Sequence, residues 1–531
     1  MIKSMRILRP YTLIFSVLLL CFNTSLKAQK KEAVPPDLDQ YVNKVLESFQ
    51  VPGVAVGIVR NGEVVLAKGY GVKKLGNPDP VDENTLFSIA SNSKAFTSAA
   101  MAILVEEGKV HWEDKVIEYL PWFQMSDAYV TAQLTIRDLF VHHSGITSYA
   151  NDILLFPPSL YTRKELLMKL KNVKLAHPFR SVYAYDNILY LAAGEIISKV
   201  SGMSWEDFVK QKIFTPVGME NSISRFSSMR DQPNIAYSHG MRNGKLQVNE
   251  DFFEQNIGDA SNPAGGVASS ALDMSKWLIT QLDSGRTPSN QKIFSPKSTR
   301  QLWKAVTPIP VSKKPAKFKP AESHYSSYAL GFSLYDYRGH YVVGHGGRLS
   351  GFVSQVAMVP ELDLGIVVLT NQNYAGAYWS ILYHILDYNM QAPPFDWIAG
   401  YKEDWDKSLA KSDSTRASRA QMKPNKHLPM SLPLEKYAGK YRDALMGKAE
   451  ITCTGKGLHL SFEKTPFFDG DLEHFHGDLF RVHYTKNKRG SGPFIYFSLN
   501  PDLSIREAKF ISSFTGSDRD LEQLSLKPVK K

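Results

Sequence analysis

Four serine and lysine pairs have the i, i+3 spacing that places a nucleophile beside its base on one helical turn. They are Ser91/Lys94, Ser289/Lys292, Ser408/Lys411 and Ser461/Lys464. Ser289 follows a turn, and Ser408 lies in a polar charged stretch. Ser461 alternates with apolar residues as in a strand, which would place its lysine on the opposite face. Only Ser91 precedes a segment, 92–107, with helix-forming residues, apolar residues at helical spacing and a glycine after its end.

A serine at a helix cap is well placed for nucleophilic acyl transfer. Its own backbone N–H lies at the positive end of the helix, where it would stabilise an oxyanion. We expect Lys94 to lie beside Ser91 on the first turn. The alternative is an ordinary capping serine with a solvated lysine, so partners elsewhere in the chain must decide between the two interpretations.

Two later elements carry polar groups that would complete such a site. Tyr185 and Asn187 lie at the N-terminal end of a predicted helix with an apolar face. His345, Gly346 and Gly347 join an apolar strand to a second strand at 352–359, and glycine there permits close approach of the backbone to a ligand. Taken singly, these residues are more often a core tyrosine, a helix cap and a strand histidine, but their order indicates a site.

The order S-x-x-K, Y-x-N and H-x-G resembles the penicillin-recognising serine hydrolases of the class C β-lactamase type, with their D-peptidase and esterase relatives. Flanking segments at 87–90, 134–145, 262–266 and 345–352 are similar to sequence motifs usual in that family. The resemblance covers about residues 37–390. It implies a serine hydrolase that needs no cofactor and no metal.

The resemblance also implies a role for each residue. Ser91 would attack a carbonyl, and Lys94 and Tyr185 would share the proton. Asn187 would position the lysine and the substrate amide. Backbone N–H groups of Ser91 and Arg348 would form the oxyanion hole. The sequence does not decide between Lys94 and Tyr185 as the base.

The third element departs from the β-lactamase pattern. Dedicated β-lactamases of this kind usually carry K-T-G, whose charged lysine faces the substrate carboxylate, and here His345 takes that position. Because histidine is only partly charged near neutrality, this favours the peptidase and esterase relatives. The Arg348 guanidinium would either compensate for the missing charge or be a solvated loop arginine.

The N-terminus predicts export. Residues 1–28 have a basic start, an apolar run at 11–22 and a polar end, as a secretory signal peptide does. We expect a periplasmic protein with no transmembrane segment after cleavage, and the residues before Cys21 make a lipoprotein anchor less favourable. The formal charge is +11, and the signal holds four of the 63 basic residues and no acidic residue, so +7 remains. That modest charge gives no support for a nucleic-acid partner.

The strand and helix patterns predict an α/β fold in which an antiparallel sheet is flanked by helices and joined to a helical lobe. This hydrolase domain would span 29–400. A polar stretch at 401–430 is typical of a linker. Short alternating segments in 431–531 predict a small antiparallel β-barrel, which looks like the lipocalin-like domain often appended to this family. It would cover the cleft, select substrates or mediate formation of a homo-oligomer.

Taken together, the sequence predicts an exported serine hydrolase that forms an acyl-enzyme on Ser91. The expected substrates are small molecules or short peptides, with a peptidase or amidase acting on D-amino-acid or peptidoglycan-type peptides, or an esterase, as the favoured activities. A β-lactamase, or a non-catalytic penicillin-binding or ligand-binding protein of the same fold, is the alternative. The sequence contains neither G-x-S-x-G nor H-E-x-x-H, the motifs of α/β-hydrolases and of zinc metalloproteases.

Overall fold

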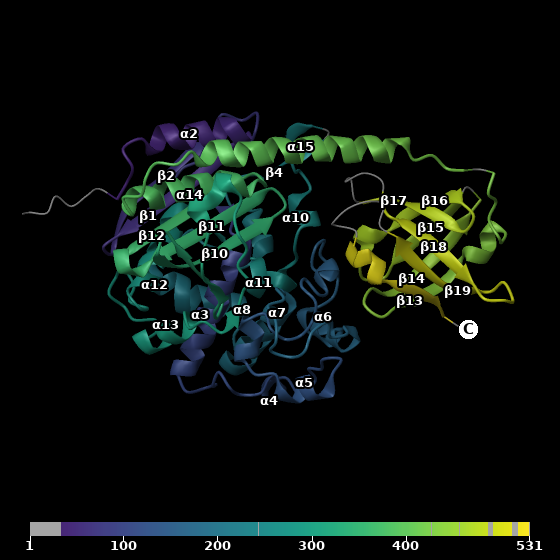
Figure 1. Ribbon diagram of the computed structural model, residues 1–531. Coiled ribbons are helices and arrows are strands. Elements are labelled where there is room, and N and C mark those ends of the chain that lie inside the picture. Colours follow the sequence, from purple (N-terminus) through teal and green to yellow (C-terminus); the bar gives the residue numbers. More distant parts are fainter. Residues whose placement is uncertain are drawn as a thin grey trace, which may run out of the picture.

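Two folded parts make up the described chain, an α/β domain and a β-barrel domain (Figure 1). The computed structural model describes residues 33–242, 244–425, 427–455, 457–486, 492–511 and 519–529. The predicted fold class is confirmed. The expected signal peptide, with Cys21, lies outside the described residues. None of the helices in the described ranges combines the length and apolar character needed to cross a membrane.

The sheet of the α/β domain has eight antiparallel strands in the order β2-β1-β12-β11-β10-β9-β8-β7. Both residues of the turn between β1 and β2, Asn61 and Gly62, have positive φ, 52° and 74°, as a type I′ hairpin requires. The sheet strands are β1 Gly53–Arg60, β2 Glu63–Gly71, β7 Thr307–Pro308, β8 Ser326–Tyr328, β9 Ser333–Tyr337, β10 His340–Leu349, β11 Phe352–Val359 and β12 Leu364–Thr370. Two small ladders pair β3 Phe87–Ser88 with β6 Ala268–Ser269, and β4 His239–Arg242 with β5 Lys245–Val248.

Helices cover both faces of this sheet (Figure 1). α14 packs on one face, with α2 and α15 against it, and α12 packs on the other face, where α3, α7 and α11 form the centre of the helical lobe. Every residue of β11 and β12 is therefore buried. The helices are α2 Leu38–Phe49, α3 Ser93–Glu106, α4 Val116–Tyr119, α5 Ala128–Gln133, α6 Arg163–Met168, α7 Ile188–Ser201, α8 Trp205–Val209, α9 Thr215–Val217, α10 Phe252–Gln255, α11 Asn262–Gly265, α12 Ala271–Leu282, α13 Pro296–Leu302, α14 Ala375–Asn389 and α15 Trp397–Gln421.

The C-terminal part is a closed eight-stranded barrel. Its strands alternate as a barrel with a packed interior requires: in β15 the side chains of Leu458, Leu460 and Phe462 are buried and those between them are partly exposed. The strands are β13 Gly439–Asp443, β14 Gly447–Thr454, β15 Gly457–Phe462, β16 Gly470–His476, β17 Leu479–Tyr484, β18 Phe494–Leu499, β19 Ile505–Ile511 and β20 Ser525–Pro528.

The stretch interpreted as a linker, 401–430, is helical over most of its length, because α15 occupies it up to Gln421 (Figure 1). The helix forms for two physical reasons. No glycine or proline lies between Gly400 and Pro424, and the buried side chains of Trp397 and Trp405 fix its first half in the core shared by α2 and α14. The polar composition that suggested a flexible chain is the composition of the exposed part of this helix.

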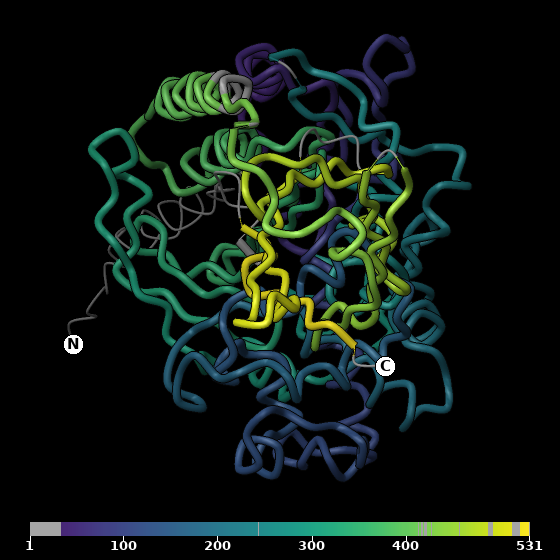
Figure 2. The backbone as a smooth tube through the Cα atoms, turned by 90° about the vertical axis from the view of Figure 1, so that its right-hand side faces the viewer, coloured from purple at the N-terminus to yellow at the C-terminus, as the bar shows by residue number. Residues whose placement is uncertain are grey.

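The barrel contacts the helical lobe, which lies behind it in the view of Figure 2. The Leu160 backbone N–H donates to the Lys464 carbonyl at 2.7 Å, and the Tyr161 hydroxyl donates to the Met446 carbonyl at 2.9 Å. An ion pair joins the Lys464 ammonium to the Glu165 carboxylate at 3.0 Å. Leu160, Tyr161 and Glu165 belong to segment 147–165, which we call the wall segment because its first part lines a cavity. Just outside this segment, Asn172 Nδ2 donates to the Ala444 carbonyl at 3.2 Å.

Candidate active site

The predicted nucleophile does not cap its helix. Ser91 lies in the middle of a single 3₁₀ turn, η1 Ala90–Asn92, and α3 begins at Ser93 with Asn92 as its N-cap. The expectation that Ser91 is the cap is therefore wrong. Ala90 has a φ of +48°, in the left-handed region, so the chain turns sharply just before the serine. Ser91 is half-buried between two buried neighbours, and it lines a cavity.

Lys94 lies one turn further on and is completely buried. Its Nζ atom is 3.2 Å from Ser91 Oγ, 2.7 Å from Asn187 Oδ1 and 2.8 Å from the Ala264 carbonyl oxygen. Burial lowers the pKa of Lys94 to about 7, although the nearby carboxylate of Asp152 opposes this. A large fraction of the protein therefore carries a neutral amine here at neutral pH.

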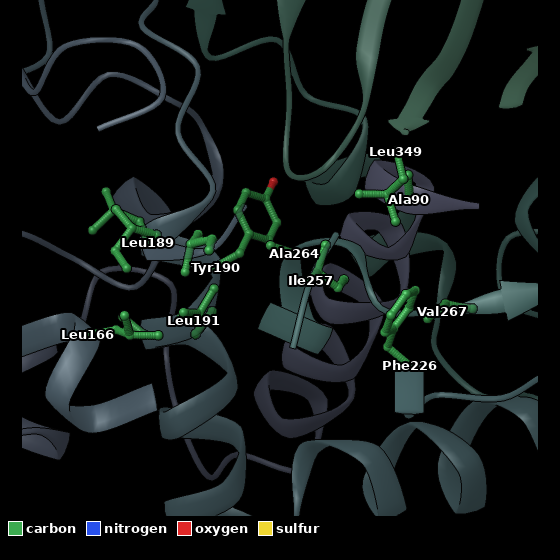
Figure 3. Close-up of a cluster of buried hydrophobic side chains, with 14 of the residues drawn as sticks. Ala90, Leu166, Leu189, Tyr190, Leu191, Phe226, Ile257, Ala264, Val267 and Leu349 are labelled. Carbon is green, nitrogen blue, oxygen red and sulfur yellow. The ribbon is translucent and has the colours of Figure 1, made fainter. Parts of the chain in front are cut away.

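The surroundings of Lys94 come from three helices that pack on one another, α3, α7 and α11. Figure 3 shows buried side chains from α7 and α11 and from the turn before α3, including Tyr190, Ala264 and Ala90. The Tyr190 ring centroid is 5.1 Å from the Lys94 nitrogen. This apolar packing excludes water from the amine and is the physical cause of its lowered pKa.

Tyr185 contacts the same serine from α7's N-terminal side. Its hydroxyl lies 2.9 Å from Ser91 Oγ, and its ring centroid is 4.9 Å from the Lys94 nitrogen. Burial raises the pKa of Tyr185 well above 10, with a smaller opposing effect of the hydrogen bond to Ser91. The phenol keeps its proton and donates it in a hydrogen bond to the serine oxygen.

Asn187 is held in one orientation by two partners. Its Oδ1 accepts from Lys94, and its Nδ2 donates to Asp152 Oδ2 at 2.8 Å. Asp152 begins a short 3₁₀ turn, Asp152–Leu154, in the wall segment. Sequence reasoning missed Asp152, because an acidic residue in an irregular segment has no periodicity or motif that marks it.

His345 lies in β10 and is nearly buried. Its Nε2 is 2.7 Å from the Tyr328 hydroxyl, and its Nδ1 is 2.6 Å from the Gly346 carbonyl oxygen. Burial, with the Lys94 charge, lowers the pKa of His345 to about 3. Since Nδ1 then donates to the carbonyl and Nε2 accepts from the phenol, the imidazole is neutral and both nitrogens are used within the protein. Tyr328 was also missed by sequence reasoning.

One edge of β10 faces the serine. β9 pairs with β10 only from His340 to Gly344. Residues 345–349 pair with β11 on one side, and β9 does not continue along their other side. Gly347 approaches η1 closely: a Cβ atom there would lie 2.1 Å from the Ile89 carbonyl oxygen. This explains why glycine is needed at that position. Arg348 follows, with an exposed side chain that lines the cavity.

The predicted site residues thus meet around one cavity of about 740 Å³. Its lining includes Ser91, Tyr185, Asn187, His345, Gly346, Gly347 and Arg348, together with Tyr149, Asp152 and Phe156 of the wall segment. The arrangement presents an oxygen nucleophile and a phenol to a bound molecule. The Lys94 amine is fully buried and reaches the cavity only through its contact with Ser91. Within the described ranges, no group of three or more histidine, cysteine or acidic side chains is arranged to hold a metal ion.

Comparison with known sequences gives two family matches. The model of the Beta-lactamase family matches residues 38–385, and a domain of unknown function, DUF3471, matches residues 423–524. The unguisins hydrolase ungD' of Aspergillus campestris is 28% identical over 420 residues, which are 76% of this chain and 75% of the relative. Protein flp of Staphylococcus aureus is 25% identical over 336 residues, 63% of each chain.

Two solved structures share the fold. The octameric penicillin-binding protein homologue from Pyrococcus abyssi aligns with a TM-score of 0.57 at 22% identity, covering 92% of this chain and 99% of that chain. The class C beta-lactamase from Rhodobacter sphaeroides aligns with a TM-score of 0.52 at 22% identity, covering 66% of this chain and 100% of that chain. At such identities the likeness establishes the fold alone.

Proposed function

Because the chain belongs to the beta-lactamase family of serine hydrolases, we propose that it is an exported peptidase, amidase or esterase that forms an acyl-enzyme on Ser91. One observation carries the proposal: the oxygen of Ser91 is within hydrogen-bond distance of both the Lys94 amine and the Tyr185 hydroxyl. A serine hydroxyl needs such a base before it attacks a carbonyl at neutral pH.

The partners of Lys94 favour the lysine as the base. A neutral amine has two N–H donors and one lone pair. Asn187 Oδ1 and the Ala264 carbonyl oxygen can only accept hydrogen bonds, so they take the two donors. The third contact, between Lys94 Nζ and Ser91 Oγ at 3.2 Å, is one in which an ammonium donates to the serine oxygen. In the neutral form its direction reverses, and the Ser91 hydroxyl donates to the lone pair. Tyr185 keeps its proton and serves as the acid.

The reaction then follows from these positions. Ser91 Oγ bonds to the substrate carbonyl carbon and its proton moves to Lys94. The bond from that carbon to the leaving nitrogen or oxygen breaks, and the proton reaches the leaving group by way of Lys94 and the Tyr185 hydroxyl. Water then attacks the acyl-enzyme, the bond from Oγ to carbon breaks, and Ser91 regains a proton. We place the oxyanion at the backbone N–H groups of Ser91 and Arg348.

Substrate class follows from the charge near the cavity. His345 is neutral, so it does not supply the cation that the K-T-G lysine offers a carboxylate. This favours short peptides, amino-acid amides and esters over β-lactams. The hydrolase activity named for the Aspergillus relatives is consistent with a non-β-lactam substrate. One observation favours the β-lactamase alternative, namely that the Arg348 guanidinium lines the cavity.

Labelling with a fluorescent fluorophosphonate tests the nucleophile. We expect the wild-type protein to be labelled and Ser91→Ala to remain unlabelled. Ser408→Ala is the matched control, since it removes the serine of another S-x-x-K string from an exposed position on α15 and should label fully. Labelling of Ser91→Ala, or none of the wild type, would overturn the proposal. D-alanyl peptides, nitroanilides, short esters and nitrocefin then rank the substrates.

Export has its own test. Expression of the full chain in a Gram-negative host, followed by N-terminal sequencing of the periplasmic fraction, should find a mature protein that begins near residue 29. A chain that keeps residues 1–28 in the cytoplasm, or one with a lipid on Cys21, would contradict this part of the proposal.

A further inference from the structure

A second cavity adjoins the one that contains Ser91. Its volume is about 430 Å³, and it shares Ser333, His345, Gly346 and Tyr378 with the first. Gly346 lies where the two meet. A Cβ atom on Gly346 would lie 2.8 Å from Gln355 Oε1 and 3.8 Å from the Tyr378 hydroxyl, so the lack of a side chain keeps the junction open.

The second cavity has a rigid aromatic wall. Tyr383 stacks on Trp379 with ring centroids 5.0 Å apart and on Tyr337 with centroids 4.9 Å apart. The Tyr337 hydroxyl donates to the Asp387 carboxylate, which also accepts from Arg338 at 2.7 Å. Because β9 and α14 hold these rings in place, the wall is formed before any ligand binds.

A loop forms the outer rim of the same cavity. Pro310, Val311 and Lys314 contribute to its lining. This loop is fixed to α15, since the Lys317 ammonium is 3.3 Å from the Glu403 carboxylate and the Phe318 and Tyr401 ring centroids are 4.5 Å apart. This loop therefore closes the outer side of the second cavity.

We propose that this aromatic pocket, bounded by Tyr335, Tyr337, Tyr378, Trp379 and Tyr383, binds a bulky apolar or aromatic group of the substrate whose carbonyl lies at Ser91. The proposal rests on the hydrolase function proposed above and names a substrate class for it. Tyr383 is already stacked on both faces, so the partly exposed Trp379 and Tyr335 provide most of the accessible aromatic surface. Such a preformed surface gains more from contact with a ring than with a methyl group. The enzyme would thus prefer aromatic peptides or esters over those with small groups.

Two variants test the pocket in catalysis. Trp379→Ala removes one face of the wall, and Ser312→Trp places a bulky side chain at the exposed rim. Two pairs of esters are compared by their kcat/KM. One pair places the ring on the acyl side, 4-nitrophenyl 3-phenylpropanoate against 4-nitrophenyl acetate, and the other on the leaving group, benzyl acetate against ethyl acetate. The wild type should favour the aromatic member of at least one pair. Each variant should reduce that preference by about tenfold with little change for the small member. Equal losses for both members would overturn the proposal.

A binding experiment separates this inference from the catalytic proposal. In the Ser91→Ala background, N-acetylphenylalaninamide should bind more tightly than N-acetylalaninamide by calorimetry, and the added Trp379→Ala change should remove the difference. Trp379→Phe should restore part of it. Equal affinities in the Ser91→Ala protein would overturn the pocket assignment, whereas absence of fluorophosphonate labelling at Ser91 would overturn only the proposed reaction.

Discussion

The Lys94 amine lies closer to Asn187 Oδ1, at 2.7 Å, than to Ser91 Oγ, at 3.2 Å. The lysine is thus held by the asparagine amide and presented to the serine. The orientation of Asn187, fixed by Asp152, decides where the amine points.

The first prediction concerns pH. If Lys94 is the base, only its neutral form activates Ser91, so kcat/KM should rise about tenfold per pH unit below the lysine's pKa and level off above it. Burial sets that pKa to about 7. The rate of fluorophosphonate labelling between pH 5 and 9 measures this rising limb of the pH profile, and it does so without a known substrate. Lys94→Met should label at least a hundredfold more slowly, by about the usual effect of removing a general base. A flat profile through pH 7 would argue against the lysine.

Asp152 should control the position of that limb. Its carboxylate raises the pKa of Lys94 by Coulombic attraction. Asp152→Asn keeps an oxygen for the Asn187 amide but removes the charge, so the limb should move to lower pH. Asp283→Asn removes an exposed carboxylate elsewhere and should leave the limb unchanged. A shift to higher pH in Asp152→Asn would show that another interaction dominates.

Tyr328 should stabilise the fold through His345. Tyr328→Phe leaves the buried Nε2 of His345 without its donor, and an unsatisfied buried acceptor costs about 1–3 kcal/mol. Tyr335→Phe is a matched control, since its buried hydroxyl has no hydrogen-bond partner among the described residues. Urea unfolding should therefore separate the two variants. Equal losses of stability would contradict the assigned tautomer of His345.

Arg348 should matter only for charged substrates. Because His345 is neutral, the exposed guanidinium of Arg348 is the cation that lines the cavity within the described structure. Arg348→Gln should raise KM for carboxylate-bearing β-lactams or D-alanyl peptides by about fivefold, as removal of one partly solvated ion pair does. A neutral ester provides the internal control. An equal rise for both substrates would indicate a structural role instead.

The barrel should hold the wall segment in place. Tyr161→Phe with Lys464→Glu removes one hydrogen bond to the barrel and replaces an ion pair with a repulsive pair. Hydrogen exchange in residues 147–165 should become faster, and kcat should fall because Asp152 belongs to this segment. Lys448→Glu disrupts a pair within the barrel and serves as control. Unchanged exchange in the double variant would mean that these two side-chain contacts do not hold the segment in place.

Much of the architecture was accessible from sequence because it depends on local pattern. The hairpin at Asn61-Gly62, the helix after Asn187 and the short alternating strands of the barrel each have a periodicity or turn signal. The residues proposed for the site meet in space because motif order reflects a shared fold. The error at Ser91 was one of capping geometry, since a 3₁₀ turn leads directly into α3 and such turns are frequent at α-helix N-termini.

What the sequence did not indicate depends on long-range packing. Asp152 and Tyr328 lie 35 residues and 17 residues from their partners Asn187 and His345, in segments without a motif. The polar stretch after residue 400 was interpreted as a linker from its composition, yet burial of Trp405 within it and of Trp397 just before it orders α15. The polar composition of this stretch describes the exposed face of α15, and it does not reveal the tryptophans that are buried beneath that face.

The three acceptors around Lys94 have a consequence for the energetics of each turnover. When the amine takes the serine proton it becomes an ammonium with three donors, and Asn187, the Ala264 carbonyl and the Ser91 oxygen are already in place to receive them. The nitrogen changes charge without moving its neighbours. Little reorganisation energy is then needed on the enzyme's side of the proton transfer, and the same three contacts serve the return of that proton in the second half of the cycle.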